Sequence, residues 1–354
     1  MHIEGLSDKL SQIYQEFGYQ AYAMSKFEEY ELYLRNKEFL VSDRVLTFTD
    51  TDGRLMALKP DVTLSIIKNT SDHEMGVQKL YYHEHVYRPG KNDQGFREIM
   101  QIGLECMGKV DTYCVLEVLQ LAVKSLEAIG KAYVLDISHM GLVSQLLDES
   151  ALSNSARKQV LEAIGNKNAH EIRTVCQKEG ADSAKLEALT KLGGKGTSVL
   201  PQLEKLFGDM PEVMQLRQLL MALEQWGAGC VNLDFSVVND MNYYNGIVFR
   251  GFVQGVPEGV LSGGQYDALM KKMGRKDHSI GFAIYPALLE RLLQPQQAEE
   301  ARMLYYEADA PIMAVQQAVE ALKQKGVCVS AQPGPAPIGA VGYQLVGNEV
   351  KDLG

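Results

Sequence analysis

Hydrophobic and polar residues near the start of the chain follow first a helical and then a strand-like spacing. Residues 6–17 place leucine, isoleucine and aromatic side chains three or four positions apart, and Gly18 ends this predicted helix. Residues 45–50 and 54–58 alternate between apolar and polar side chains around the dipeptide Asp52-Gly53, which is typical of a hairpin turn. The pattern predicts one helix followed by a β-hairpin.

The next stretch combines a longer hairpin with two further helices. The elements that the spacing predicts are, in order, a helix at 62–68, a strand at 80–88, a polar loop at 89–95, a strand at 97–107, an amphipathic helix at 112–129 and a strand at 133–137. Antiparallel strands with helices packed on one side indicate the α+β fold class.

A long helical segment interrupts the strands. Residues 140–226 have helical spacing almost throughout, and we interpret them as a helical insertion in the parent sheet. A last helix of this region is predicted at 287–293, before Pro295. The strands predicted after the insertion are 231–238, 247–253 and 260–261.

The composition changes after Pro295. Residues 312–325 are predicted to be helical and 326–330 to be a short strand, and the Pro- and Gly-rich run 333–337 is predicted to end regular structure. We therefore expect a core domain at 1–294 and a short C-terminal appendage at 295–354, which is too short for an independent domain of average size.

The composition of the 354 residues limits the class of protein. A net charge of -10 argues against a broad nucleic-acid-binding surface, and no apolar run approaches the length of a membrane span. The cysteines are odd in number and widely spaced, at positions 106, 114, 176, 230 and 328. Neither a disulfide framework nor a metal site is indicated, and we expect a soluble cytoplasmic protein without a cofactor, with no membrane contact and no tRNA partner.

One run of residues carries the most specific signal. Asn239-Asp240-Met241-Asn242-Tyr243-Tyr244-Asn245-Gly246-Ile247-Val248-Phe249 resembles the signature Arg-Gly-Leu-Asp-Tyr-Tyr-Thr-x-x-Val-Phe, with which histidyl-tRNA synthetases line their amino-acid pocket. The twin tyrosines and the following strand are present. Asn239 stands where the catalytic arginine of that signature would be.

The hairpin after residue 80 contains a second such element. Arg97, Gln101, Gly103 and Glu105 follow the pattern Arg-x-x-x-Gln-x-Gly-x-Glu, and with Arg88 they resemble motif 2 of class II aminoacyl-tRNA synthetases in its histidyl form. On a strand, Gln101, Gly103 and Glu105 point to one face, where Gly103 would leave room for a ligand. The glutamine and glutamate could accept hydrogen bonds from an ammonium group and an imidazole N–H, although any one of them alone would fit a solvated sheet face equally well.

Two further elements distinguish the branches of this family. Leu58-Lys59-Pro60-Asp61 with Thr63 resembles Arg-Pro-Asp-x-Thr of the regulatory subunits of short-form ATP phosphoribosyltransferase, where the synthetases have glutamate. Alone, Asp61 fits an acidic residue at a helix N-terminus equally well. The segment 135–141 contains Leu-Asp-Ile-Ser-His-Met-Gly, which resembles an element common in the regulatory family, and its His139 fits either a structural turn or a ligand contact.

The last two signatures lie near residue 270. Residues 262–269 resemble Gly-Gly-Arg-Tyr-Asp-x-Leu, the second histidine-specific signature, with Gln265 in place of the arginine. The paired glycines allow a positive φ and a close backbone approach. Residues 280–283 resemble the start of motif 3, so that the resemblance covers residues 1–294 in the family's order.

The departures from the synthetase pattern affect the groups that bind ATP. Asn239, Gly95 and Leu288 occupy three of the family's arginine positions, and Arg291 would reach the third only through a local insertion. Each lost charge-assisted contact removes about 1.5–3 kcal/mol, so adenylation would slow by several powers of ten. Arg88 and Arg97 remain as a residual phosphate-binding or ATP-like site.

The resemblance therefore implies a regulatory subunit of ATP phosphoribosyltransferase, a non-catalytic paralogue of histidyl-tRNA synthetase. It implies a homodimeric class II core with a six- or seven-stranded antiparallel sheet flanked by helices. The partner would be the short-form catalytic subunit, which this chain would activate and place under feedback by L-histidine in the first step of histidine biosynthesis. The histidine-binding residues implied are Asp61, Thr63, Arg88, Gln101, Glu105, Asn239, Tyr243, Tyr244 and Tyr266.

Other interpretations stay open at this point. The chain could be a divergent, truncated histidyl-tRNA synthetase or another amino-acid adenylating enzyme, although the tail after Pro295 is shorter than the synthetase's C-terminal anticodon-binding domain of roughly 100 residues. It could also be a stand-alone amino-acid-binding module. The feedback site could lie between subunits, and the stoichiometry, the docking surface and the role of the tail are not determined by the sequence.

Overall fold

The computed structural model describes residues 3–72, 76–90, 95–130, 132–238, 243–290, 292 and 301–354. The chain divides into two compact units, residues 1–294 and 295–354, each with its own hydrophobic core. Asn239 and Arg291 lie outside the described residues. Within the described part, no helix is long and apolar enough to cross a membrane.

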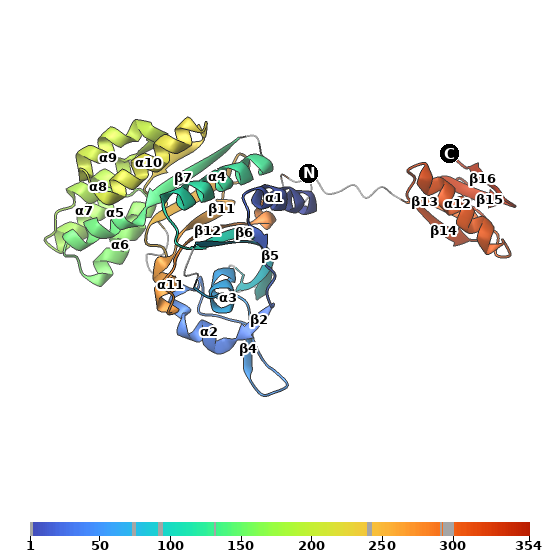
Figure 1. Cartoon of the computed structure of the whole chain (residues 1–354), viewed down its shortest axis with the longest axis horizontal. Helices are drawn as coiled ribbons and strands as arrows, with labels where there is room; N and C mark the ends of the chain where they lie inside the picture. The colour runs from blue at the N-terminus through green and yellow to red at the C-terminus, as the bar shows by residue number, and fades with distance from the viewer. Residues whose placement is uncertain are drawn as a thin grey trace. The chain divides into compact units, whose positions relative to one another are not determined.

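A nine-stranded sheet forms the centre of the first unit (Figure 1). In spatial order its strands are β1 (Gln20–Ala21), β5 (Val77–Pro89), β6 (Phe96–Gly108), β12 (His278–Ile284), β11 (Leu261–Gln265), β10 (Ile247–Val253), β7 (Tyr133–His139), β9 (Val231–Asp234) and β8 (Gly193–Lys195). Within the six strands from β5 to β7, each neighbouring pair is antiparallel. At the two ends of this group, β1 pairs with β5 in parallel and β9 pairs with β7 in parallel. The antiparallel centre matches the expected sheet, and the three outer strands extend it.

Two layers cover the sheet. On one face lie α1 (Ile3–Glu16) and α4 (Thr112–Ile129), whose apolar sides enter the main core (Figure 1). On the other face lie three short helices and a small antiparallel sheet, namely α2 (Tyr30–Arg35), η1 (Lys37–Phe39), α3 (Val62–Asn69), β2 (Phe27–Glu29), β3 (Thr47–Thr49) and β4 (Leu55–Leu58). Helices packed on a largely antiparallel sheet agree with the predicted α+β class.

The helical insertion comprises six helices, α5 (Met140–Glu149), α6 (Asn154–Gly165), α7 (Ala169–Lys178), α8 (Ala184–Lys191), α9 (Leu200–Phe207) and α10 (Pro211–Gln225). Between α8 and α9 the chain returns to the sheet as β8 and then forms the short 3-10 helix η3 (Gly196–Val199). The insertion is therefore tied to the sheet by a strand as well as by its ends.

Three strand and helix predictions were inaccurate. The strand at 231–238 ends at Asp234, because the carboxylate of Asp234 accepts a hydrogen bond from the Ser236 N–H at 2.8 Å and turns the chain. The strand at 260–261 continues to Gln265 as β11. The helix at 287–293 is the 3-10 helix η4 (Pro286–Leu289) in its described part. Residues 267–272 form α11 (Asp267–Lys272).

The prediction that regular structure ends at residues 333–337 was wrong. The second unit contains β13 (Arg302–Tyr306), α12 (Ile312–Gln324), β14 (Val329–Pro333), β15 (Gly342–Val346) and β16 (Glu349–Asp352), with strand order β14-β13-β15-β16. Leu304 and Leu345 pack on α12 in a small core of their own. Gly347, at φ +62, starts the tight turn between β15 and β16, which pair as an antiparallel hairpin. The sequence analysis overlooked the short apolar alternation of residues 343–350.

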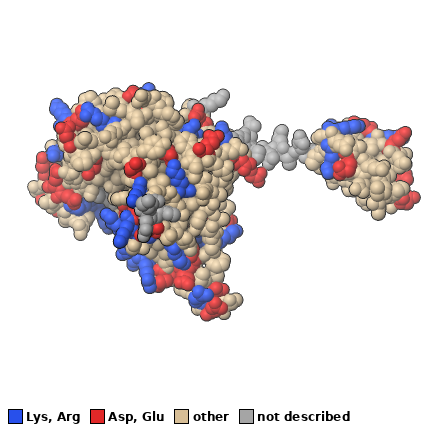
Figure 2. Space-filling model, viewed as in Figure 1, with Lys and Arg blue, Asp and Glu red and all other residues tan. Residues whose placement is uncertain are grey.

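Acidic and basic side chains of the described residues are interspersed over the face of the molecule that Figure 2 shows. This distribution accompanies the net charge of -10 of the whole chain.

Candidate functional site

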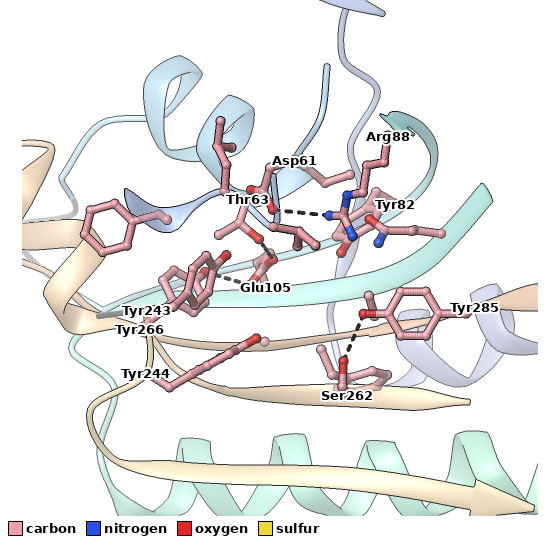
Figure 3. Close-up of a pocket in the computed structure, with 18 residues that line it drawn as sticks. Asp61, Thr63, Tyr82, Arg88, Glu105, Tyr243, Tyr244, Ser262, Tyr266 and Tyr285 are labelled. Atoms are coloured by element: carbon pink, nitrogen blue, oxygen red, sulfur yellow. Dashed lines mark hydrogen bonds and ion pairs between the residues drawn. The ribbon is translucent and has the colours of Figure 1, made fainter. Parts of the chain in front are cut away.

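A cavity of about 240 Å³ lies on the face of the central sheet that also carries α3 (Figure 3). It is lined by eight of the nine residues that the sequence placed in a histidine site, namely Asp61, Thr63, Arg88, Gln101, Glu105, Tyr243, Tyr244 and Tyr266. These residues come from α3, β5, β6, the segment before β10 and the end of β11. The fold therefore brings together side chains that are up to two hundred positions apart in the sequence.

Gly281 lines the cavity beside Glu105, and Gly264 lies next to it in the sheet. In the sheet register Glu105 of β6 lies opposite Gly281 of β12, and Gly281 lies opposite Gly264 of β11. A Cβ atom on Gly281 would overlap Oε2 of Glu105, and one on Gly264 would lie 2.7 Å from Cδ1 of Tyr244. Two side chains of the site thus occupy space that only glycine leaves open.

The sequence analysis expected a positive φ or a close backbone approach at Gly263 and Gly264, and room for a ligand at Gly103. Gly263 and Gly264 lie inside a strand without a positive φ, so the close approach is required there and the left-handed conformation is not. The space beside Gly103 is filled by the ring and hydroxyl of Tyr82, and the expectation of room for a ligand at that position was wrong.

We expect Gly281→Ala to lower the free energy of unfolding by about 1–3 kcal/mol and to weaken ligand binding, because the added methyl group displaces the Glu105 carboxylate. Chemical denaturation and calorimetry would measure the two effects. Gly229→Ala is the matched control, since the atom nearest to its added Cβ would be Nζ of Lys195, at 3.9 Å. Equal behaviour of the two variants would contradict this assignment.

Glu105 is the most deeply buried charged group of the cavity, with 2% of its surface exposed. Its Oε1 accepts a hydrogen bond from the Thr63 hydroxyl at 2.8 Å, and its Oε2 accepts one from the Tyr266 hydroxyl at 2.6 Å. Burial raises the pKa of the carboxyl from 4.5 to about 8, although these two hydrogen bonds oppose the shift. The group thus holds a proton at neutral pH while no cation or N–H donor faces it.

This pKa predicts how stability depends on pH. An unfolded glutamate ionises near 4.5, whereas folded Glu105 keeps its proton until about 8, so its contribution to stability is present below pH 4.5 and is lost as the pH rises to about 8. Denaturation curves of wild type and Glu105→Gln should therefore differ in slope within this window and run parallel above it. A constant difference from pH 4 to pH 9 would contradict the raised pKa.

Asp61 and Arg88 form the second charged group of the cavity. Asp61 caps α3 by accepting a hydrogen bond from the Leu64 N–H at 2.9 Å, and its other oxygen lies 3.6 Å from the Arg88 guanidinium. Arg88 also donates to the Pro60 carbonyl at 2.7 Å. Burial raises the pKa of Asp61 in spite of the nearby Arg88. Arg88 is the one cationic side chain among the described residues that line the cavity.

Aromatic rings form the side walls. The ring centroids of Tyr243 and Tyr244 are 4.6 Å apart, and those of Tyr243 and Tyr266 are 6.1 Å apart. The sequence had missed Tyr82 and Tyr285, which also line the cavity. Strand alternation could have found Tyr285, because it follows Gly281 by two periods of two residues.

Arg97, the second residue assigned to a residual phosphate site, does not line the cavity. It lies opposite Arg88 in the hairpin of β5 and β6 and is exposed. His139, which the sequence left open, has a structural position at the start of α5. Its Nδ1 accepts a hydrogen bond from the Gly141 N–H, and its Nε2 lies 3.1 Å from Oε1 of Gln215.

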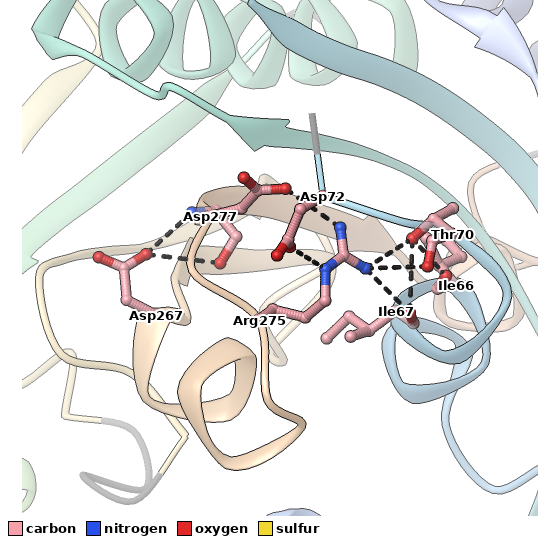
Figure 4. A network of polar contacts seen from close by, with 8 residues as sticks. Ile66, Ile67, Thr70, Asp72, Asp267, Arg275 and Asp277 are labelled. Atoms are coloured by element: carbon pink, nitrogen blue, oxygen red, sulfur yellow. Dashed lines mark hydrogen bonds and ion pairs between the residues drawn. The ribbon is translucent and has the colours of Figure 1, made fainter. Parts of the chain in front are cut away.

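A network around Arg275 holds two walls of the cavity together (Figure 4). The guanidinium donates to the carbonyl groups of Ile67 and Thr70 at 3.0 and 3.1 Å, and it pairs with Asp72 and with Asp277. The two carbonyls belong to the end of α3, and the start of α3 carries Asp61 and Thr63. Arg275 follows α11, which begins directly after Tyr266. The sequence analysis had missed Arg275.

The geometry limits the chemistry of a ligand. Two buried carboxyl groups favour a ligand with positively charged or N–H groups, one guanidinium favours a carboxylate, and the tyrosine walls favour a planar ring. No cluster of three or more metal-binding side chains occurs in the described parts of the chain. The arrangement fits a zwitterionic amino acid with a flat polar side chain.

Comparisons with known proteins agree with this fold. The sequence profile of histidyl-tRNA synthetase matches residues 1–289. An ATP phosphoribosyltransferase regulatory subunit of Caldanaerobacter subterraneus subsp. tengcongensis is 31% identical over 305 residues, which cover 83% of this chain and 79% of the relative.

Solved structures show the same fold at lower identity. A protein from Bacillus halodurans described as an ATP phosphoribosyltransferase regulatory subunit/histidyl-tRNA synthetase superposes with a TM-score of 0.79 at 22% identity, covering 93% of this chain and 88% of that one. A chain of the ATP phosphoribosyl transferase (HisG:HisZ) complex from Thermotoga maritima gives a TM-score of 0.64 at 19% identity, covering 80% and 97%. The chain therefore belongs to the histidyl-tRNA synthetase family and, within it, to the group of ATP phosphoribosyltransferase regulatory subunits.

Proposed function

We propose that this protein is a regulatory subunit that assembles with the catalytic subunit of ATP phosphoribosyltransferase, binds L-histidine in the cavity and carries out no catalysis itself. One observation supports the histidine site above all. The buried carboxyl of Glu105 is surrounded by tyrosines at one side of the cavity, while Arg88 lies at another (Figure 3). An imidazole and an α-carboxylate would complement these two groups.

The proposed contacts follow from the positions of the side chains. Glu105 and Tyr244 bind the imidazole, while Asp61, Thr63 and Gln101 hold the α-ammonium group. Arg88 binds the carboxylate, together with Asn239, which lies outside the described residues. The Thr63 hydroxyl can serve the ammonium as an acceptor while it still donates to Glu105, since a hydroxyl has one proton and two lone pairs.

The absence of catalysis is proposed from the groups that would face ATP. Adenylation requires cations at the phosphates and at the charge that develops on the α-phosphorus. Arg88 is the one cation among the described lining residues, and in the proposed complex it binds the carboxylate of histidine. Leu288, at a position where the family has an ATP-binding arginine, packs against the hydrophobic core.

Three measurements on the full chain test this proposal. Calorimetry should detect binding of L-histidine, and ATP–pyrophosphate exchange should be absent with histidine present. Mixing with a short-form catalytic subunit should give a complex with higher phosphoribosyltransferase activity, which histidine then lowers. Pyrophosphate exchange would favour an adenylating enzyme instead, and histidine binding without complex formation would favour a stand-alone binding module.

Feedback places one further requirement on the complex. Histidine can shift the complex to an inactive form only if it binds the two forms with different affinity.

We propose a homodimeric core for the regulatory subunit, and size-exclusion chromatography with light scattering should find two chains per particle in the absence of the partner.

A further inference from the structure

We propose that Tyr285 sets the outer limit of the cavity, so that the site accepts an amino acid with a free carboxylate and rejects one whose carboxyl group is esterified or adenylated. This inference rests on the proposed function, because it assumes that the ligand is an amino acid held by Glu105 and Arg88. It names the residue that determines which derivatives of that amino acid can enter.

The strand register gives the cavity a direction. Gly281 lies beside Glu105, and Tyr285 follows Gly281 by four residues. Tyr285 is the residue directly after β12, so at about 3.3 Å per residue it lies roughly 13 Å beyond the row of Glu105, and it lines the same cavity. Gln101 precedes Glu105 by the same number of residues on the antiparallel strand β6 and so lies toward the same end. A ligand with its ring at Glu105 thus directs its carboxyl group toward Tyr285.

Tyr285 is held by one backbone contact and one side-chain contact. Its backbone N–H donates to the Val260 carbonyl at 2.9 Å, and its hydroxyl lies 2.9 Å from Oγ of Ser262 on β11 (Figure 3). Tyr82 and Tyr244 line the same cavity as Tyr285. The ring therefore lines the cavity in a position that both contacts hold.

The size of the cavity agrees with this limit. Its volume of about 240 Å³ is below the roughly 300–1,000 Å³ typical of sites that enclose drug-sized ligands. An amino acid fits such a volume, whereas an attached nucleotide would need the space that the Tyr285 ring occupies. Two independent observations therefore argue against a nucleotide in this site. One is the loss of arginines from the ATP-facing positions, and the other is the position of Tyr285.

The test compares two ligands by calorimetry on the full chain, L-histidine and a non-hydrolysable sulfamoyl analogue of histidyl-adenylate. Wild type should bind histidine at least about 100-fold more tightly than the analogue, and Tyr285→Ala should reduce this ratio by about tenfold or more. Tyr285→Phe keeps the ring and should keep most of the ratio. Ser262→Ala removes the hydroxyl partner and should give an intermediate ratio, which provides a second variant if Tyr285→Ala does not fold.

The outcomes separate the two proposals. Wild type that binds no histidine would overturn the proposed function and this inference with it. Histidine binding accompanied by equally tight binding of the analogue would overturn the inference alone, and so would unchanged ratios in folded Tyr285→Ala and Ser262→Ala. A larger gain in affinity for the analogue in Tyr285→Ala than in Tyr285→Phe would support the ring as the outer limit of the cavity.

Discussion

Replacing Glu105 with glutamine is expected to weaken the binding of L-histidine by about 100-fold, or about 2.7 kcal/mol. The carboxyl is buried and already accepts hydrogen bonds from Thr63 and Tyr266, so the ligand supplies the cation or N–H that makes ionisation favourable. Glutamine keeps the shape but carries no charge, and its NH₂ group faces hydroxyl groups that now donate. Calorimetry at pH 7 measures the loss.

Glu98→Gln is the matched control for this prediction. Glu98 lies on the same strand, is exposed, and accepts a hydrogen bond from Tyr87 outside the cavity. Its replacement should leave histidine binding unchanged. Wild type should also release a proton on binding, because Glu105 holds one at neutral pH, and titrations in two buffers of different ionisation enthalpy would detect it. Full affinity in Glu105→Gln would refute the assignment of this cavity to histidine.

Arg275→Ala is expected to lower the free energy of unfolding by about 3–5 kcal/mol, the range for breaking a buried ion pair on one side. The side chain of Arg275 is 9% exposed, and that of its partner Asp277 is 8% exposed. Its removal leaves Asp277 without this partner and the carbonyls of Ile67 and Thr70 without their donor. Because these carbonyls end α3, the helix that positions Thr63, histidine binding should weaken as well.

The control for this variant is Arg54→Ala. Arg54 also pairs with two carboxylates, Glu29 and Asp52, but all three side chains are largely exposed, so its loss should change stability little. Arg275→Lys keeps the charge and loses the fork of donors, and it should fall between wild type and Arg275→Ala. Denaturation with urea, followed by circular dichroism, compares the three variants. Similar losses for Arg54→Ala and Arg275→Ala would contradict the structural role of the network.

Much of the core could be predicted from local patterns. The helix at residues 112–129 and the long hairpin of β5 and β6 follow from spacing alone, because each element buries one continuous apolar side. The motif order placed Glu105 and Tyr266 in one site before any distance was known, and the structure joins them at 2.6 Å. Their roles toward a ligand stay predictions.

Other parts depended on contacts that no local pattern encodes. The hairpin of β15 and β16 has only a short apolar alternation, and it is stabilised by packing on α12. The roles of Gly281 and Gly264 depend on which strands lie beside them, since the overlap involves side chains on other elements. The sequence analysis missed Arg275 because three of its partners, Ile67, Thr70 and Asp72, lie about two hundred positions away.

The sequence by itself determined the family, the order of the elements and the identity of most side chains that line the cavity, since motif residues and their spacing are properties of the chain alone. Only the tertiary structure decided that Glu105 is buried with two hydroxyl donors, that Arg97 does not line the cavity, and that Tyr285 does. Burial, pKa and free volume depend on the distances between strands that are remote in sequence. Those distances arise when the sheet assembles.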